Sequence, residues 1–283
     1  MEYDAVIHGV QQMQELSAEL RQQGKRIGLV ATMGALHEGH LSLLDVARER
    51  ADVVVVSIFV NPTQFGPNED FSVYPRQLEA DVALCRERGA DVIFVPEHQA
   101  IFPEGFSTFV KEEAVASGLC GVSRPGHFRG VTTVVTILFN IVQPHIAVFG
   151  QKDAQQCAVI YKMIKDLAVP IEMVLAPTVR ESNGLAMSSR NQYLDQDQRR
   201  EAAKIYRALQ EAKSMAGSPG YSIERLRAGI MNQLTRGPKL RVIYVEIVNR
   251  YTMEPVKTIA HGETLAMVAV WLDEVRLIDN VVL

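Results

Sequence analysis

Hydrophobic positions along the first two thirds of the chain follow two alternating spacings. Short apolar runs rich in β-branched residues are separated by longer segments in which apolar residues recur every three or four positions. The run 53–60 is almost wholly apolar, which is typical of a central parallel strand covered on both faces. The predicted strands are 27–31, 53–60, 92–95, 146–149 and 171–175.

Helical spacing fills the intervals between these strands. Pro75 is expected to open one helix and Gly89 to close it. The segment 131–142 is rich in β-branched residues, but its length favours a buried helix. The predicted helices are 41–47, 75–89, 131–142 and 155–167. This alternation indicates an α/β fold, a parallel sheet with helices on both faces, and ligand sites at the carboxyl ends of its strands.

The pattern changes after Arg190. Two helices are expected at 196–215 and 223–234, separated by a Gly- and Pro-containing break at 216–220. Two strands, 241–249 and 265–272, follow. We therefore expect a domain at 1–180 and a smaller C-terminal α+β domain at 181–283, which is a candidate lid and lies next to any dimer interface.

Composition narrows the class of protein. The 283 residues are 47% hydrophobic and carry a formal net charge of −4 without a block of Lys and Arg, so nucleic acid is not an expected partner. No apolar run approaches the ~20 residues that span a bilayer, and the N-terminus lacks a signal-peptide core. Cys85, Cys120 and Cys157 are widely spaced, as buried thiols of a reducing compartment would be. We expect a cytoplasmic protein without a membrane partner.

A first chemical motif follows the strand at 27–31. It reads Met33-Gly34-Ala35-Leu36-His37-Glu38-Gly39-His40. His37 and His40 stand where a strand gives way to a helix, and the N–H groups of a helix N-terminus attract phosphate. Zinc is an alternative, but the spacing is not the zincin pattern and no Cys cluster completes a site. A purely structural pair of histidines is the other alternative.

A second motif and one lysine complete the predicted nucleotide site. The motif, Met187-Ser188-Ser189-Arg190-Asn191, offers two hydroxyls and a guanidinium, and Lys152 follows the strand at 146–149 in Gly150-Gln151-Lys152-Asp153. A lysine at a helix start opposes the helix dipole, so a phosphate ligand would explain it. The chain contains neither a P-loop nor a Gly-x-Gly-x-x-Gly turn. Together the motifs predict a site that binds ATP and promotes attack on its α-phosphate.

Amides and cations suggest how an acid is recognised. Asn61 and Gln64 follow the strand at 53–60, and Gln155-Gln156 follows Lys152, so each amide can pair with hydroxyl or carboxylate groups. Arg124 and Arg129 lie in a Gly- and Pro-containing loop where either could bind a carboxylate bidentately, although a surface turn is the simpler interpretation.

These residues resemble the pantothenate synthetase family, ATP-dependent ligases that join pantoate to β-alanine. The resemblance covers nearly the whole chain. The matching segments are 32–40, 59–65, 74–76, 124–130, 149–153 and 184–191. The family belongs to the HIGH/KMSKS nucleotidyltransferases, with a Rossmann-like N-terminal domain and a smaller C-terminal domain. This sequence has Gln151 where many relatives carry Glu, and Arg190 where the wider superfamily often has lysine.

The resemblance implies a role for each site residue. His40, His37 and Lys152 are expected to be catalytic. ATP is expected to contact Met33, Gly34, Ala35, Leu36, His37, Glu38, Gly39, His40, Gly150, Gln151, Lys152, Asp153, Val179, Met187, Ser188, Ser189 and Arg190. Pantoate and β-alanine are expected to contact Gln64, Gln156, Asn61, Arg124, Val134 and Val135. Asp81 is the candidate magnesium ligand, because family members act with Mg²⁺, typically as cytoplasmic homodimers.

The implied reaction is the condensation of (R)-pantoate with β-alanine through a pantoyl adenylate, with release of AMP and pyrophosphate. Two other classes remain as alternatives. One is an adenylyltransferase of the nicotinamide or phosphopantetheine type, which lacks the 61–65 and 124–130 segments. The other is a non-catalytic nucleotide-binding protein, which would tolerate loss of His40 or Lys152. A tRNA synthetase is disfavoured by the net charge.

Overall fold

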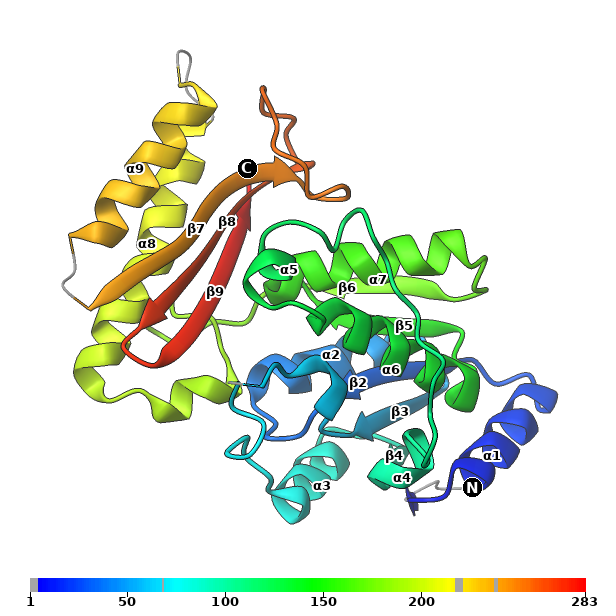
Figure 1. The fold of residues 1–283 in the computed structure, drawn as a ribbon. Helices are drawn as coiled ribbons and strands as arrows, with labels where there is room; N and C mark the ends of the chain where they lie inside the picture. The colour runs from blue at the N-terminus through cyan, green and yellow to red at the C-terminus, as the bar shows by residue number, and fades with distance from the viewer. Residues whose placement is uncertain (1–4, 68, 217–220, 237–238) are drawn as a thin grey trace. The chain divides into compact units, whose positions relative to one another are not determined.

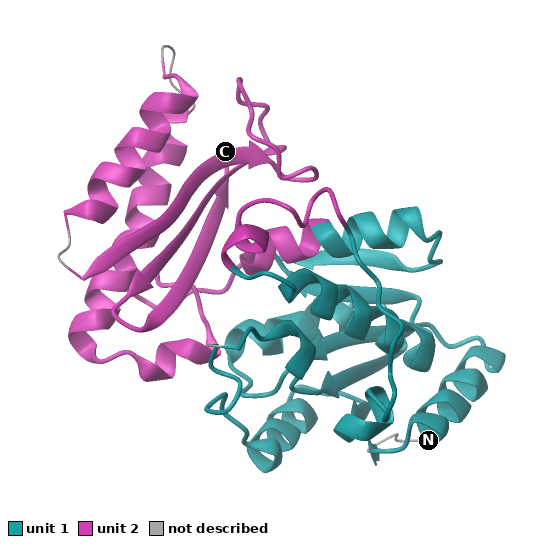
Figure 2. Ribbon diagram, viewed as in Figure 1, with its two compact units in different colours: residues 1–112, 124–151, 159–177 teal, residues 113–123, 152–158, 178–283 magenta. Residues whose placement is uncertain are grey.

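The computed structural model describes residues 5–67, 69–216, 221–236 and 239–283. The chain divides into two compact units, shown in teal and magenta in Figure 2. Unit 1 comprises residues 1–112, 124–151 and 159–177, and unit 2 comprises residues 113–123, 152–158 and 178–283. The predicted boundary at residue 180 differs from this division, because two earlier segments group with the C-terminal part of the chain.

Unit 1 contains a parallel sheet whose described strands have the order β1-β4-β3-β2-β5-β6 (Figure 1). The strands are β1 (Ala5–Ile7), β2 (Ile27–Thr32), β3 (Val53–Ile58), β4 (Val92–Phe94), β5 (Ile146–Gly150) and β6 (Glu172–Ala176). All residues of β3 are buried, which requires cover on both faces. The predicted parallel sheet is confirmed. Strand β2 pairs with both β3 and β5, so the segments that follow these three strands leave from one edge.

The helices around this sheet largely match the predicted ones. They are α1 (Val10–Gln22), α2 (Glu38–Arg48), α3 (Leu78–Glu87), α4 (His98–Ile101), α6 (His127–Val142) and α7 (Ala154–Asp166), with short 3₁₀ turns η1 (Pro62–Gln64) and η2 (Gln151–Asp153). Residues 152–158, at the end of η2 and the start of α7, belong to unit 2. The ambiguous segment 131–142 is a buried helix, as its length indicated. Helix α3 begins at Leu78 and not at Pro75. Arg76 donates hydrogen bonds to the carbonyls of Phe71 and Tyr74, which stabilise a loop there.

Unit 2 contains an antiparallel sheet, as expected of an α+β domain. Its described strands have the order β7-β8-β9. The elements are α5 (Cys120–Ser123), η3 (Ser189–Tyr193), α8 (Gln196–Ala216), α9 (Ile223–Thr235), β7 (Leu240–Asn249), β8 (Thr264–Leu272) and β9 (Val275–Val282). Helices α8 and α9 cover one face of the sheet, and Leu209, Leu226 and Val268 share the resulting core (Figure 1). Residues 217–220 of the predicted break lie outside the described residues.

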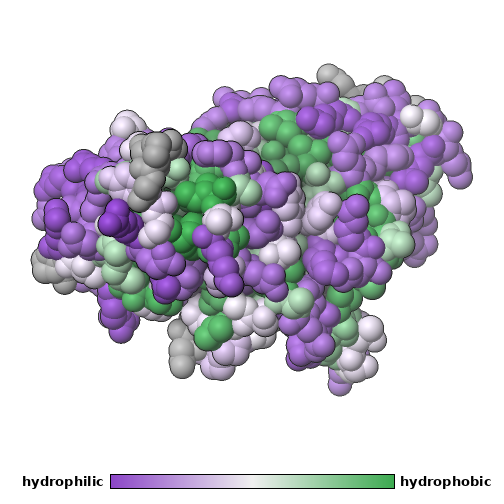
Figure 3. Space-filling model, turned by 90° about the horizontal axis from the view of Figure 1, so that it is seen from above, coloured by the Kyte–Doolittle hydropathy of each residue, from purple (hydrophilic) through white to green (hydrophobic). Residues whose placement is uncertain are grey.

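The prediction of buried, unpaired cysteines is confirmed. Cys85, Cys120 and Cys157 are free and buried. Burial raises the pKa of Cys85 to about 12, so its thiol stays protonated. Among the described residues, no helix combines the length and apolar character needed to cross a membrane. The face seen in Figure 3 is mostly hydrophilic, with hydrophobic residues in smaller separate patches.

Candidate active site

The first motif forms the loop between β2 and α2. Gly34 and Ala35 both have positive φ, +79° and +50°, so the chain turns sharply before the helix. His37 caps α2: its Nδ1 accepts a hydrogen bond of 3.1 Å from the N–H of Gly39. The rings of His37 and His40 lie 4.1 Å apart between centroids. Two imidazoles therefore stand together at the N-terminus of a helix.

The cap also fixes the protonation pattern of His37. A backbone N–H can only donate, so Nδ1 of His37 is the unprotonated nitrogen and Nε2 carries the proton in the neutral ring. His37 can then donate one hydrogen bond from Nε2. The partial positive charge of the helix N-terminus acts at the same place, which suits a phosphate oxygen.

Asp81 of α3 fixes the shape of this loop. Its carboxylate accepts hydrogen bonds from the N–H groups of Ala35 (2.9 Å) and Leu36 (2.8 Å), and the residue is 1% exposed. A Cβ on Gly34 would lie 2.8 Å from Asp81 Oδ2, so the contact also requires glycine there. Both oxygens are thus occupied within the protein. The described residues include no cluster of three or more His, Cys, Asp or Glu that fits a metal ion, and the magnesium role predicted for Asp81 gains no support.

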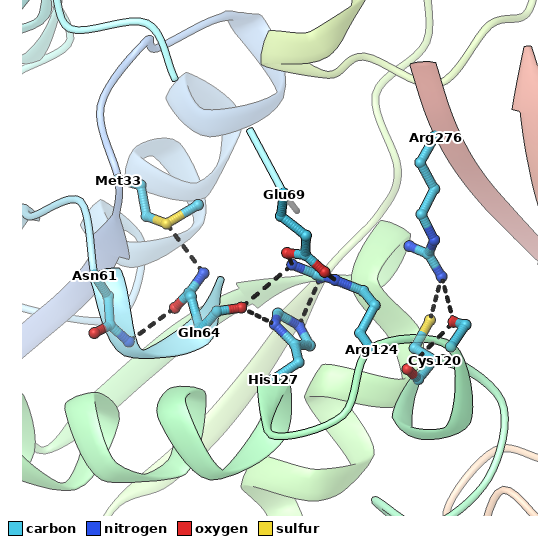
Figure 4. Close-up of polar contacts among 9 residues, drawn as sticks. Met33, Asn61, Gln64, Glu69, Cys120, Arg124, His127 and Arg276 are labelled. Carbon is cyan, nitrogen blue, oxygen red and sulfur yellow. Dashed lines mark hydrogen bonds and ion pairs between the residues drawn. The ribbon is translucent and has the colours of Figure 1, made fainter. Parts of the chain in front are cut away.

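Asn61 determines which atoms Gln64 presents. The Oδ1 atom of Asn61 accepts a hydrogen bond from the N–H of Thr63 (3.2 Å), so Nδ2 must be its donor. Nδ2 donates to the carbonyl of Gly130 and to Oε1 of Gln64, both at 3.1 Å. Gln64 Nε2 then lies 3.0 Å from the sulfur of Met33 (Figure 4). Unit 1 therefore brings the predicted acid-binding amides to the first motif, with the NH₂ group of Gln64 on that side.

Arg124, predicted to bind a substrate carboxylate, contacts a carboxylate of the chain itself. Its guanidinium donates to both oxygens of Glu69, at 2.8 and 2.6 Å, and also to His127 Nε2 at 2.9 Å (Figure 4). Because Nε2 accepts, Nδ1 of His127 carries the proton and donates to the carbonyl of Gln64 at 2.9 Å. Burial raises the pKa of Glu69, but the hydrogen bond and charge of Arg124 outweigh it, so the pKa lies below its ordinary value.

Helix α6 packs against the turn η1, which carries Gln64. A Cβ on Gly130 would lie only 2.4 Å from the carbonyl oxygen of Thr63, so η1 packs directly on the helix backbone. Val134 follows Gly130 by four positions and shares its helix face. Val134 and Val135 are 7% and 5% exposed. Their predicted contact with a substrate stays a prediction.

Unit 2 carries Lys152 and Gln156. Lys152 lies in η2, directly after β5, with its Nζ 3.7 Å from Asp153 Oδ2 and its side chain 22% exposed. Gln155 is 2% exposed, and its amide accepts from the N–H of Cys120 and donates to main-chain carbonyls of the 113–120 segment. Gln155 therefore has a structural role, whereas Gln156 remains the predicted ligand of the pair.

The second motif is fastened at both ends. Val179 and Met187 are joined by a 3.0 Å main-chain hydrogen bond, closing a hairpin, and Ser188 then caps η3. Asn191, 4% exposed, donates to Glu181 Oε1 at 2.8 Å and to the carbonyl of Ala186 at 3.0 Å. The hydroxyls of the motif are thus carried by a well-anchored segment.

The predicted residues fall into one set in each unit. Unit 1 holds the 33–40 loop, the amides, Arg124, the two valines, Gly150 and Gln151. Unit 2 holds Lys152, Asp153, Gln156, Val179 and 187–190. Sequence reasoning missed Glu69, the structural role of Asp81, and the polar pair Asp279-Asn280. A signal for that pair exists, since Asp-Asn interrupts an apolar run near the C-terminus.

Comparisons with known proteins identify the family. The family model for pantoate–β-alanine ligase matches residues 5–282. The pantothenate synthetase of Thermotoga petrophila is 49% identical over 278 residues, covering 98% of this chain and 99% of that protein. The enzyme of the same name from Moorella thermoacetica is 52% identical, covering 94% of each chain.

Comparison with solved structures identifies the same family. Pantothenate synthetase from Thermus thermophilus superposes with a TM-score of 0.92 at 43% identity, covering 98% of each chain. The ligase from Francisella tularensis, solved in complex with βγ-ATP and β-alanine, has a TM-score of 0.80 at 34% identity, covering 98% of this chain and 97% of that one. The chain therefore belongs to the family of pantoate–β-alanine ligases, the pantothenate synthetases.

Proposed function

We propose that this ligase condenses (R)-pantoate with β-alanine to pantothenate through a pantoyl adenylate, consuming ATP and releasing AMP and pyrophosphate. The observation that carries the proposal is the contact between the 33–40 loop and Gln64 within unit 1. The paired imidazoles at the start of α2 belong to the same loop as Met33, whose sulfur contacts the amide of Gln64. A phosphate-binding helix end and an acid-binding amide thus adjoin each other.

The first step activates the acid. An oxygen of the pantoate carboxylate attacks the α-phosphorus of ATP, the bond to the bridging oxygen breaks, and pyrophosphate leaves. Negative charge builds on the phosphate oxygens, where donors fixed in advance are most effective. His37 carries a proton on Nε2 in its neutral ring, His40 stands in the first turn of the helix, and Lys152 supplies a cation. Ser188 and Ser189 are proposed to bind the same nucleotide.

Gln64 is proposed to orient pantoate through its NH₂ group, with Gln156 as a second amide. The role predicted from the sequence is revised for Asn61 and Arg124, which lie next to Gln64. Asn61 and Arg124 are engaged with Gln64 and its loop, so we assign them to positioning that glutamine rather than to substrate contact. Magnesium, which the family resemblance implies, would enter with ATP and be held by its phosphates.

The second step forms the amide. The neutral amine of β-alanine attacks the acyl carbon of the adenylate, the carbon–oxygen bond to AMP breaks, and the nitrogen gives up a proton to solvent. The resulting products are pantothenate and AMP. The complex of the Francisella relative with β-alanine and an ATP species supports both substrates.

An isotope experiment tests the adenylate. Pantoate labelled with ¹⁸O in its carboxylate should transfer one label to AMP, because the attacking oxygen stays with AMP when the amine displaces it. Label in pyrophosphate or phosphate, or none in AMP, would exclude an acyl adenylate. Pyrophosphate release from ATP with pantoate as the sole acid tests the first step alone. If no pyrophosphate is released with pantoate, whether or not β-alanine is present, the proposed activity is refuted. That result would favour the non-catalytic or adenylyltransferase alternatives.

Variants test the residues. His40→Ala and Lys152→Ala should each slow pyrophosphate release about a hundredfold or more, because one preorganised donor is typically worth ~3–4 kcal/mol. Release at the wild-type rate in a burst experiment would refute the assignment for that residue. The proposed homodimer follows from the family resemblance, and light scattering of the purified protein tests it. The proposed cytoplasmic location follows from that resemblance and from the widely spaced, buried cysteines.

A further inference from the structure

Two consecutive polar residues are buried in β9. Asp279 and Asn280 are 4% and 3% exposed, although the strand around them is largely apolar. Neighbouring side chains on a strand point to opposite faces of the sheet, so the pair serves two different partners. Buried polar side chains almost always have hydrogen-bonding partners, and here both partners belong to unit 2.

Asp279 pairs with Arg180. The guanidinium donates to both carboxylate oxygens, at 2.6 and 2.9 Å, and also to the carbonyl of Gly184 at 3.1 Å. It stacks 3.6 Å from the ring centroid of Tyr206. Arg180 bridges to Ala186 within the hairpin that precedes the second motif. The carboxylate thereby fixes that hairpin to β9, at the position that pairs with Val268 of β8.

Asn280 is hydrogen-bonded to the main chain of Lys152. Its main-chain N–H donates to Asp279 Oδ1 at 2.8 Å, so the aspartate also orients the residue that follows it. Its side-chain Nδ2 donates to the carbonyl of Lys152 at 3.0 Å. This hydrogen bond joins residues 128 positions apart in the sequence. It holds the main chain of the three-residue turn η2, and the orientation of that turn determines where the lysine side chain points.

We infer that Asn280 is a positioning residue for Lys152, held in place by the Arg180–Asp279 pair, and that it sets the affinity for the ATP phosphates without contacting them. The inference rests on the proposed function, in which Lys152 binds nucleotide. One polar dipeptide of β9 then supports both the lysine and the 179–187 hairpin of the nucleotide-binding set.

The test is a double-mutant cycle read out by calorimetric affinity for a non-hydrolysable ATP analogue with Mg²⁺, in the absence of pantoate. Asn280→Ala should weaken binding about three- to tenfold, the net worth of one hydrogen bond. Asn280→Asp keeps the shape but loses the donor, so it should weaken binding at least as much. In a Lys152→Ala background, Asn280→Ala should change affinity less than about twofold, because coupled residues are non-additive.

Ser222→Ala is the control. It removes a hydrogen bond of 3.3 Å that caps α9 in the same unit, so it should lower the melting temperature without changing nucleotide affinity. A purely structural role for Asn280 would give the same loss with and without the Lys152 side chain, and that result would overturn the inference. So would wild-type affinity in both Asn280 variants while Lys152→Ala binds weakly.

Failure of the proposed function looks different. Lys152→Ala with unchanged affinity would remove the lysine from the nucleotide site, and the inference with it. A wild-type protein that binds no ATP analogue would refute the proposed function at its first step.

Discussion

Replacing Gly130 by alanine should displace Gln64, the residue proposed to bind the acid, through a clash with the main chain of η1. The added Cβ would lie 2.4 Å from the carbonyl oxygen of Thr63 and 2.6 Å from the nitrogen of Gln64, whereas ordinary contacts begin at 3.4 Å. The clash is with backbone atoms, so no side chain can rotate away. Turn η1 must therefore move by about 1 Å, and such overpacking typically costs ~1–3 kcal/mol of folding stability.

The catalytic effect should exceed the loss of stability. A displacement of about 1 Å at a substrate-positioning group can cost roughly a hundredfold in rate. We expect Gly130→Ala to lower kcat/KM for pantoate by about ten- to a hundredfold in the pyrophosphate-release assay, at a temperature where thermal unfolding shows the variant to be folded. The KM for ATP should change much less, because the substitution acts on Gln64.

Gly229→Ala provides the matched control. Apart from the adjacent residues and the backbone of α9 itself, no atom lies within 4 Å of a Cβ built there, and the residue is in the middle of α9. Alanine should be neutral or stabilise by up to about 1 kcal/mol, with wild-type kinetics. If Gly130→Ala behaved like this control in both stability and pantoate kinetics, the close packing of η1 on α6 would be refuted.

Further predictions concern the two loops and one ion pair. Asp81→Asn should destabilise the first motif by about 1–3 kcal/mol and raise the KM for ATP, because an amide nitrogen replaces one acceptor; unchanged nucleotide affinity would contradict this. Gly184→Ala should lower the melting temperature, since φ is +93° and the new Cβ would lie 2.6 Å from the Tyr206 ring; an unchanged melting curve would argue against this packing. Glu69→Gln should cost about 1–2 kcal/mol near neutral pH. The folded-state pKa of Glu69 is below its ordinary 4.5, so its stabilisation is present above that pH and lost as the pH falls through the lowered value. Urea unfolding should show the variant and wild type converging in acid, and a pH-independent difference would exclude Arg124 as the cause.

Strongly patterned elements could be predicted from the sequence. The strand β3 was predicted correctly from its uniformly apolar composition, and the helix over 131–142 was predicted correctly from its length. Helix α1 was missed, since it buries only Met13, Ser17 and Leu20 and most of its other residues are polar. Strand β9 was missed because Asp279 and Asn280 interrupt it, and their value depends on partners far along the chain.

The candidate site shows the same limit. The sequence places imidazoles at a helix start and amides after a strand, and the structure has both there. The partners of these side chains were not predictable. Nothing in the sequence says that Glu69, 55 positions before Arg124, already occupies the guanidinium. Nor does it say that Asp81 accepts hydrogen bonds from the main-chain N–H groups of Ala35 and Leu36. Such pairings are set by tertiary packing, which local spacing does not encode.

The hydrogen bond between Asn280 and the Lys152 turn has a consequence during synthesis of the chain on the ribosome. Its two ends are separated by 128 residues, and protein synthesis proceeds at about 5–20 residues per second. A nascent chain thus exposes the lysine turn for roughly 6–25 seconds before its partner exists. Products of premature termination before β9 would contain every motif of the N-terminal part and still lack this support. Nucleotide affinity would therefore report on completed synthesis of the C-terminal strand.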